Sequence, residues 1–214
     1  MNYKPKQLII IGDSSVYGWG DSEAGGWSTR LSRHWINSGK NAVIYSLGIR
    51  GDGLEDVAQR WYREWRCRGE LRRNFPEGLL LSVGLNDTAR IGREDGRPQL
   101  SVDAFRFGFE RLLKQMKKEA QVMVIGLTPV NENKMPFAKC LWYSNKSCSL
   151  YESLIEESCL ELDVPFLATY KNMRDELLWK EWITADGIHL NSEGHKWLFK
   201  RLREWAPLTT WVDL

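Results

Sequence analysis

The sequence alternates short, largely apolar runs with longer segments in which apolar residues recur every three or four positions. The first run, residues 8–11, leads directly into Gly12-Asp13-Ser14. Similar runs occupy residues 41–46, 79–83, 121–127 and 164–169. Runs this short, with little polar interruption, are typical of strands that are buried on both faces of a parallel sheet.

Segments with the helical period follow these runs. They cover residues 27–38, 54–65, 101–116, 149–159, 172–182 and 191–205. Parallel strands need crossover connections, and right-handed crossovers place helices on both faces of a sheet. The alternation therefore predicts a three-layer α/β/α fold around a five-stranded parallel sheet, with residues 1–214 forming a single domain.

Two segments lack a clear period. Residues 130–149 are rich in apolar side chains, and an irregular segment of that length in a compact domain usually has a function. We therefore expect it to bind substrate. Ser149 and Glu152 have the spacing of a capping box, which predicts that the next helix begins there. Pro207 is expected to end the last helix, and the tail after it is left unassigned.

Composition and charge are those of an ordinary globular protein. Hydrophobic residues make up 43% of the 214 residues and charged residues 27%, which excludes disordered and fibrous classes. A net charge of +2 gives no general attraction to nucleic acid. One basic segment is interleaved with aromatic residues, and we interpret it as a solvated helix face with buried rings rather than a nucleic-acid site. It contains Arg60, Trp61, Tyr62, Arg63, Trp65, Arg66, Arg68, Arg72 and Arg73.

No apolar run suits a membrane segment. The run after the polar residues 1–7 is shorter than the core of about 7 to 15 residues in a signal peptide. None approaches the roughly 20 residues of a membrane span, so we expect no integral membrane association and a cytoplasmic location. The four cysteines have no CxxC spacing, which favours reduced thiols, with a Cys140–Cys148 bridge as the alternative.

The residues that end the first three strands point to nucleophilic catalysis. Ser14, Gly48 and Asn86 should meet at one edge of the sheet, because parallel strands all end there. A serine nucleophile needs a base. His34 and His195 lie within predicted helices, where a structural role is the ordinary interpretation, whereas His189 lies in a loop.

Asp186 precedes His189 by three residues in Asp186-Gly187-Ile188-His189. A carboxylate there can accept the Nδ1 hydrogen of the imidazole and stabilise the imidazolium that forms when Ser14 loses its proton. The backbone N–H groups of Ser14 and Gly48 and the side-chain amide of Asn86 can donate to a developing oxyanion. We expect Ser14, Asp186 and His189 to be catalytic.

Aromatic side chains near these positions suggest the substrate wall. Trp19 follows the Ser14 turn, and Trp142 and Tyr143 belong to the irregular segment 130–149. We expect all three to bind substrate, because their rings can pack on an apolar acyl group or stack on a sugar.

The sequence resembles the GDSL, or SGNH, hydrolase superfamily in four blocks that occur in the family's order. These blocks are Gly12-Asp13-Ser14, Gly48 with Gly51-Asp52, Gly84 with Asn86-Asp87, and Asp186 with His189. The resemblance implies a flavodoxin-like sheet of order 2-1-3-4-5. It also implies a GDSL-type esterase, lipase or acylhydrolase that needs no cofactor or metal. Ser14 would be nucleophile and oxyanion donor, Gly48 and Asn86 oxyanion donors, His189 the base and Asp186 its partner. Position 15 is Ser, where the family name has Leu.

Other functions remain as alternatives. The substrate expected is a small carboxylic ester or thioester, but an acetylated carbohydrate is the rival within the enzyme class. A catalytically idle domain that binds an acyl or glycosyl group is the rival outside it. No dinucleotide or Walker motif is present. A magnesium site formed by Asp13, Asp52, Asp87 and Asp186 is a weaker alternative, because it gives Ser14 and His189 no role.

Overall fold

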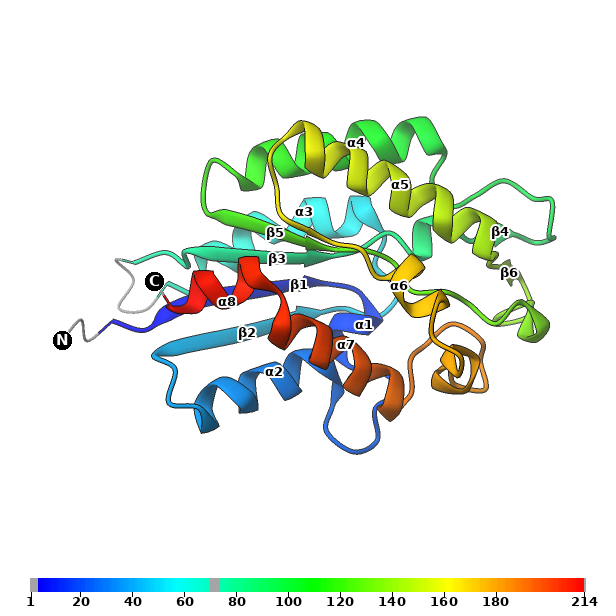
Figure 1. Cartoon of the computed structure of the whole chain (residues 1–214). Coiled ribbons are helices and arrows are strands. Elements are labelled where there is room, and N and C mark those ends of the chain that lie inside the picture. The colour runs from blue at the N-terminus through cyan, green and yellow to red at the C-terminus, as the bar shows by residue number, and fades with distance from the viewer. Residues whose placement is uncertain (1–3, 70–73, 214) are drawn as a thin grey trace.

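The computed structural model describes residues 4–69 and 74–213, and a parallel sheet runs through the middle of it (Figure 1). Its strand order is β2-β1-β3-β5-β7. Counted along the chain, this is the order 2-1-3-4-5, so the expected α/β fold is confirmed. The strands are β1 (Lys6–Gly12), β2 (Ala42–Gly48), β3 (Gly78–Ser82), β5 (Gln121–Ile125) and β7 (Phe166–Leu167).

Helices cover both faces of the sheet, which gives three layers (Figure 1). One layer contains α3 (Leu54–Arg66), α4 (Val102–Met116) and α5 (Asn145–Glu161). The other contains α2 (Gly26–Asn37), α7 (Ser192–Glu204) and α8 (Ala206–Asp213). The remaining elements lie towards the carboxyl ends of the strands: the short helices α1 (Ser14–Tyr17) and α6 (Tyr170–Arg174), and a small antiparallel pair, β4 (Arg90–Ile91) with β6 (Leu141–Trp142).

The side chains of β1 show why its sequence is uninterruptedly apolar. Ile9 and Ile11 pack into the core under α3 and α4, whereas Leu8 and Ile10 pack into the core beside α2 and α7. All four are fully buried. Because successive residues of a strand point to opposite faces, a strand covered on both sides needs apolar residues at every position.

The helix predicted over residues 172–182 is wrong. The chain forms α6, turns, and then forms a short 3₁₀ helix, Trp179–Trp182. Leu177, which fits the apolar period, is 99% exposed. In residues 177–182 only Trp179 is buried, against the core beside α7. The apolar period of this segment therefore does not mark a buried helix face.

The capping box predicted at Ser149 is also wrong. α5 begins one turn earlier, after Ser144, whose hydroxyl accepts a hydrogen bond from the backbone N–H of Ser147. The Glu152 carboxylate instead accepts hydrogen bonds from the backbone N–H groups of Leu127 and Tyr170, and so links α5 to the end of β5. Burial raises the pKa of Glu152 to about 7, although these hydrogen bonds oppose the rise.

The tail after residue 205 forms a further helix, α8. Pro207 lies in the first turn of α8. Backbone N–H groups there make no hydrogen bond within a helix, so a proline, which has no N–H, is tolerated. Trp211 is buried and stacks on Trp35 of α2, with ring centroids 6.3 Å apart. Packing on the sheet therefore holds α8 in place. Pro207 ends no helix, because α7 already ends at Glu204 and Pro207 lies inside α8.

The basic segment on α3 has the geometry expected of a solvated face. Trp61 and Trp65 are buried, while Arg60 pairs with Asp52 and Arg68 with Glu64. Arg72 and Arg73 lie outside the described residues. All four cysteines are free thiols, so the Cys140–Cys148 alternative is not realised. Within residues 4–69 and 74–213, none of the helices is long and apolar enough to cross a membrane.

Candidate active site

Ser14 lies at the carboxyl end of β1, where the strand turns sharply into α1. A Cβ on Gly12 would lie 1.9 Å from the carbonyl oxygen of Ser82, so only glycine fits this approach of β1 to β3. The Asp13 carboxylate accepts a hydrogen bond from the Ser15 N–H and caps α1. The Ser15 hydroxyl accepts a hydrogen bond from the Trp27 indole. A leucine at this position has no oxygen that could accept it.

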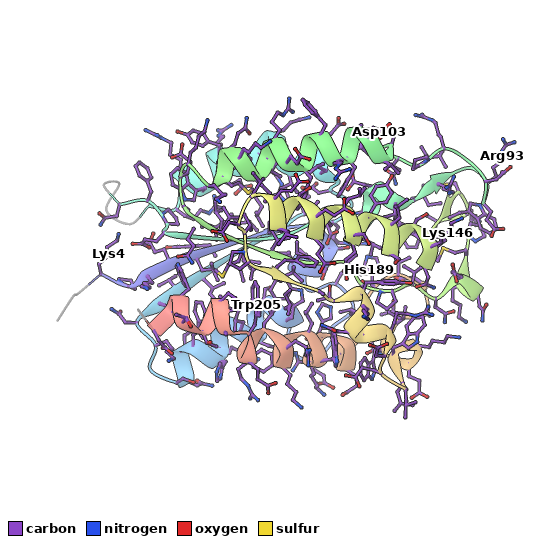
Figure 2. All side chains as sticks on the ribbon, turned by 45° about the horizontal axis from the view of Figure 1, so that its top comes forward. Lys4, Arg93, Asp103, Lys146, His189 and Trp205 are labelled. Atoms are coloured by element: carbon purple, nitrogen blue, oxygen red, sulfur yellow. The ribbon has the colours of Figure 1, made fainter. Side chains whose placement is uncertain are left out.

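The structure brings Ser14, His189 and Asp186 into one chain of hydrogen bonds. The Ser14 Oγ is 3.0 Å from His189 Nε2, and His189 Nδ1 is 2.7 Å from Asp186 Oδ2. Ser14 and His189 are both buried, at 8% and 9% exposure. Figure 2 shows His189 in the half of the molecule that carries Lys146 and Arg93, opposite Lys4. This is the edge where the strands end.

The Asp186 carboxylate is held in one orientation. Its Oδ1 accepts hydrogen bonds from the Thr184 hydroxyl and from the backbone N–H groups of Ile188 and His189. Burial alone would raise the pKa of Asp186, but the hydrogen bonds from His189, Thr184 and the backbone outweigh it and hold that pKa well below the usual range. Asp186 is therefore a stable carboxylate beside Nδ1, which fixes the His189 tautomer with Nε2 facing Ser14.

Asn86 lines the hollow over Ser14, as expected, but Gly48 does not. Gly48 pairs with Gly12 in the sheet, and Gly51, three residues later, lines the hollow instead. A Cβ on Gly48 would lie 2.1 Å from the backbone nitrogen of Tyr17, so the glycine lets α1 pack directly on β2. Asn86 begins a 3₁₀ turn, Asn86–Thr88, after β3. Its Nδ2 donates to the Asp52 carbonyl at 2.9 Å, and its Oδ1 accepts from the Tyr143 hydroxyl at 3.2 Å. These two contacts fix which way the amide faces.

Arg60 of α3 links the strand ends that carry these groups. Its guanidinium donates to the Gly12 carbonyl at the end of β1 and to the Leu47 carbonyl near the end of β2. It also forms a 2.7 Å ion pair with Asp52, whose carbonyl holds Asn86. One half-buried cation thus fixes the spacing between the ends of β1 and β2 and the loop that holds Asn86.

A pocket of about 320 Å³ lies over Ser14. Phe137 and Trp19 flank His189 from two sides, with ring centroids 6.1 and 6.3 Å from the imidazole. Trp19 is 40% exposed and lines a neighbouring hollow that reaches Asp186. The pocket over Ser14 is lined by Ser14, Arg50, Gly51, Asn86, Phe137, Ile188 and His189.

Two of the expected substrate residues lie elsewhere. Trp142 is half-buried in β6, where it pairs with Arg90, and it does not line this pocket. Tyr143 is 3% exposed and packs in a small core beneath residues 130–149, so its contact is with Asn86 rather than with solvent. The correction follows from the β4–β6 pairing, which sequence periodicity could not reveal. Sequence reasoning also missed Arg50 and Phe137, which no motif marks.

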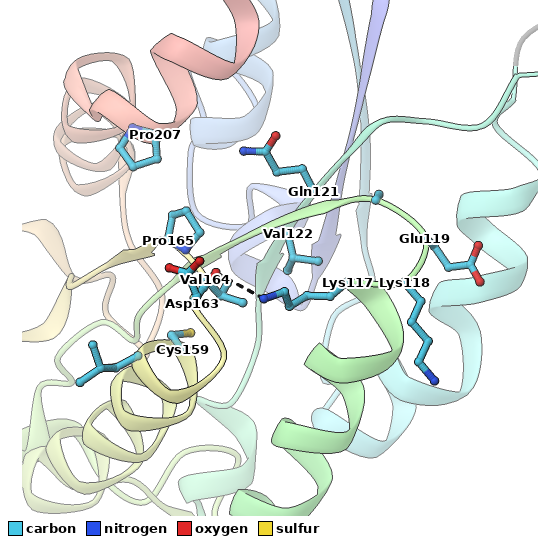
Figure 3. A pocket seen from close by; sticks show the side chains of 12 residues that line it. Lys117, Lys118, Glu119, Gln121, Val122, Cys159, Asp163, Val164, Pro165 and Pro207 are labelled. Atoms are coloured by element: carbon cyan, nitrogen blue, oxygen red, sulfur yellow. Dashed lines mark hydrogen bonds between the residues drawn. The ribbon is translucent and has the colours of Figure 1, made fainter.

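A larger hollow, of about 860 Å³, lies at the opposite edge of the sheet (Figure 3). It is formed between the end of α4, the start of β5 and the segment that joins α5 to β7, with Lys117, Gln121 and Pro165 among its lining residues. None of the candidate catalytic residues lines it. Size alone therefore does not identify the active site here.

The four carboxylates considered as magnesium ligands each have protein partners. Asp52 pairs with Arg60, Asp186 with His189, and Asp87 accepts from the Leu54 N–H with both oxygens. Burial raises the pKa of Asp13 to about 6 and that of Asp87 to about 7. In the part of the chain that the structure describes, no group of three or more ligating side chains is placed to hold a metal ion.

The two other histidines differ in their surroundings. His195 is fully buried, accepts a hydrogen bond from the Trp27 N–H at Nδ1 and donates from Nε2 to the Trp19 carbonyl. Burial lowers its pKa, so the imidazole is neutral and holds the Trp19 loop in place. His34 lies on α2, where its ring packs edge-on against Phe199.

Comparison with known proteins finds relatives along nearly the whole chain. It is 26% identical over 203 residues to an Escherichia coli protein named as thioesterase 1, protease 1 and a lysophospholipase, covering 92% of this chain and 83% of that protein. The solved structure of a lipase/acylhydrolase from Enterococcus faecalis has a TM-score of 0.74 at 20% identity, covering 92% of each chain. That of an acetylxylan esterase from Geobacillus stearothermophilus has a TM-score of 0.71 at 15% identity, covering 93% of each. At these identities the structures demonstrate a shared fold.

A family model described as the GDSL-like Lipase/Acylhydrolase family matches residues 10–197. The match begins within β1 and ends within α7, so it includes every residue of the candidate site. The chain therefore belongs to the GDSL-like lipase/acylhydrolase family.

Proposed function

We propose that this protein is a serine esterase that cleaves a carboxylic ester or thioester through an acyl-Ser14 intermediate. The observation that carries the proposal is the hydrogen-bonded chain from Ser14 Oγ through His189 to Asp186, at 3.0 and 2.7 Å. A serine needs such a base to become nucleophilic at neutral pH. The two solved structures named above are a lipase/acylhydrolase and an acetylxylan esterase, which supports the same chemistry.

The first half of the reaction forms the acyl-enzyme. His189 Nε2 takes the proton from the Ser14 hydroxyl as the oxygen attacks the ester carbonyl, and Asp186 stabilises the imidazolium. The carbonyl oxygen becomes an oxyanion that faces the Ser14 N–H and the Asn86 amide, with the Gly51 backbone lining the same pocket. When the tetrahedral intermediate collapses, the bond to the leaving alcohol or thiol breaks, and that group leaves with the proton from His189.

Water completes the cycle. His189, neutral again, takes a proton from a water molecule that attacks the acyl carbon, and the same donors face the second oxyanion. Collapse releases the carboxylic acid and returns the proton to Ser14. His189 must be neutral at the start of each half-reaction, because only then can Nε2 accept a proton.

The pocket supports a short to medium acyl chain. Its volume of about 320 Å³ holds few carbon atoms, and its apolar wall consists chiefly of Phe137 and Ile188. An acetylated carbohydrate is the second candidate, because the exposed ring of Trp19 lies beside His189 and one structural relative is an acetylxylan esterase. We further propose that the chain acts as one catalytic domain, since both cores pack on the same sheet.

Replacing Ser14 tests this proposal. We expect Ser14→Ala to lower the hydrolysis of p-nitrophenyl acetate and butyrate by at least about 1,000-fold, as removal of a catalytic nucleophile does. Ser15→Ala is the matched control, because the neighbouring hydroxyl bonds Trp27 and not His189. Circular dichroism checks that both variants are folded.

A domain that only binds acyl or glycosyl groups would behave differently. It would hydrolyse neither ester and would not react with a fluorophosphonate probe, which modifies an activated serine. Equal activity of wild type and Ser14→Ala would refute Ser14 as the nucleophile. Comparison of acetate release from acetylated xylan with release of longer acyl chains would separate the two substrate classes.

A further inference from the structure

A cationic side chain lies in the pocket over Ser14 without a carboxylate partner. Arg50 follows β2 and lines the pocket together with Ser14 and His189. Its guanidinium lies 3.4 Å from the centre of the Trp19 ring, a close cation–π contact. Among the described residues, Arg50 contacts the Trp19 ring and forms no ion pair.

The Trp19 ring is a fixed support for Arg50. The backbone N–H of Trp19 donates to the Ser14 carbonyl, and the Trp19 carbonyl accepts a hydrogen bond from the buried His195. The next residue, Gly20, packs so closely that a Cβ there would lie 2.1 Å from the Leu190 carbonyl oxygen. Because this loop is tied to the residues around the triad, Arg50 is held at a defined place beside Ser14.

The acidic residues two positions from Arg50 and two positions from Trp19 do not neutralise Arg50. Asp52 is paired with Arg60 and accepts a 2.7 Å hydrogen bond from it. Asp21 in the Trp19 loop is paired with Arg30 at 2.9 Å. The guanidinium of Arg50 therefore carries a positive charge that forms no ion pair with a described carboxylate. A guanidinium stacked on an aromatic ring keeps its N–H edge free for a carboxylate or phosphate.

We propose that the natural substrate of this enzyme is an ester that carries a negative charge, a carboxylate or a phosphate, bound by Arg50. The inference rests on the proposed function, because it assigns the substrate of that same site. The anionic group would lie over the Trp19 side of the pocket while the ester carbonyl lies at Ser14. Arg50 is then a specificity residue, which binds substrate and takes no part in proton transfer.

Two matched pairs of esters test this inference, one for each side of the ester bond. Mono-4-nitrophenyl glutarate and its methyl ester differ only in a charge on the acyl side. 4-Acetoxybenzoate and its methyl ester differ only in a charge on the leaving-group side. The measured quantity is the ratio of kcat/KM for the charged ester to that for the neutral ester, compared between proteins so that intrinsic reactivity cancels.

We expect Arg50→Gln to lower this ratio by about five- to tenfold for at least one pair, the range between an exposed ion pair and a charge-assisted hydrogen bond. The ratio of the wild type should also fall as ionic strength rises, because added salt screens a partly exposed charge. Arg111→Gln is the control, since Arg111 is an exposed arginine near the Phe107 ring on α4 that does not line the pocket. It should leave the ratio unchanged.

The outcomes separate the two proposals. If Arg50→Gln and Arg111→Gln give the same ratio as the wild type for both pairs, the inference about Arg50 is wrong while the esterase function stands. If Ser14→Ala retains full activity on the neutral esters, the proposed function itself fails. A loss confined to the acyl pair or to the leaving-group pair supports the inference and tells which side of the ester bears the charge.

Discussion

Tyr143 offers a sharp test of how the oxyanion donors are arranged. Its hydroxyl donates to the Asn86 Oδ1 at 3.2 Å, and burial raises the pKa of Tyr143, so the hydroxyl keeps its proton. The second contact of the amide is the 2.9 Å hydrogen bond from Nδ2 to the Asp52 carbonyl. A rotated amide would lose both contacts and would present its oxygen, rather than its N–H, to the developing oxyanion.

Tyr143→Phe removes one of these two restraints and leaves the ring in place. A neutral hydrogen bond contributes about 0.5–1.5 kcal/mol, and 1.4 kcal/mol corresponds to about tenfold in an equilibrium. We therefore expect kcat to fall about two- to tenfold with little change in KM, because the loss is felt in the transition state. Complete loss of the donor, as in Asn86→Ala, should cost roughly 100- to 1,000-fold.

The assay compares Tyr143→Phe with Tyr151→Phe. Tyr151 is also buried, and its hydroxyl donates to the Leu100 carbonyl away from the site. Both variants should lose a similar free energy of unfolding, but only Tyr143→Phe should lower kcat and slow inactivation by a fluorophosphonate. The positioning argument is refuted if the two variants have the same kcat despite equal losses of stability.

Two further predictions concern buried polar groups outside the triad. The Gln7 side chain is fully buried, and neither its Nε2 nor its Oε1 has a hydrogen-bond partner. Gln7→Met should therefore raise the free energy of unfolding, measured in urea, by about 1–2 kcal/mol. A loss of stability would contradict this account. Burial raises the pKa of Asp87 to about 7, so the native state binds its proton more tightly than the unfolded state, and the contribution of Asp87 to stability falls as pH rises from about 4 to about 7. Asp87→Asn should match wild type near pH 4 and exceed its stability near pH 8. A variant equally destabilised at both pH values would show that the carboxylate is not the cause.

The meeting of the proposed catalytic residues could be predicted because it depends on topology alone. A buried run such as residues 8–11 shows where a strand lies, and parallel strands bring their carboxyl ends together whatever the loops do. Ser14 and Asn86 could thus be expected to meet although they are far apart in the chain. His189 could be selected because it is the one histidine in a loop, next to a carboxylate three positions away.

The surroundings of the site could not be predicted, because they depend on contacts that leave no local pattern. Tyr143 reaches Asn86 across 57 positions through a two-residue strand pairing. Ser144 and Ser149 are equally good helix caps by type, and only the structure shows that Ser144 is used. Leu177 follows a helical period and yet faces solvent, since no neighbouring layer covers it.

The hydrogen bond between Ser14 and His189 joins residues 175 positions apart. The proposed nucleophile is therefore synthesised 175 residues before its proposed base. A growing chain can acquire the first strand, the oxyanion donors and most of the sheet while it still has no group to take a proton from Ser14. We therefore expect an interrupted product that stops before residue 189 to lack the proposed base and to be inert.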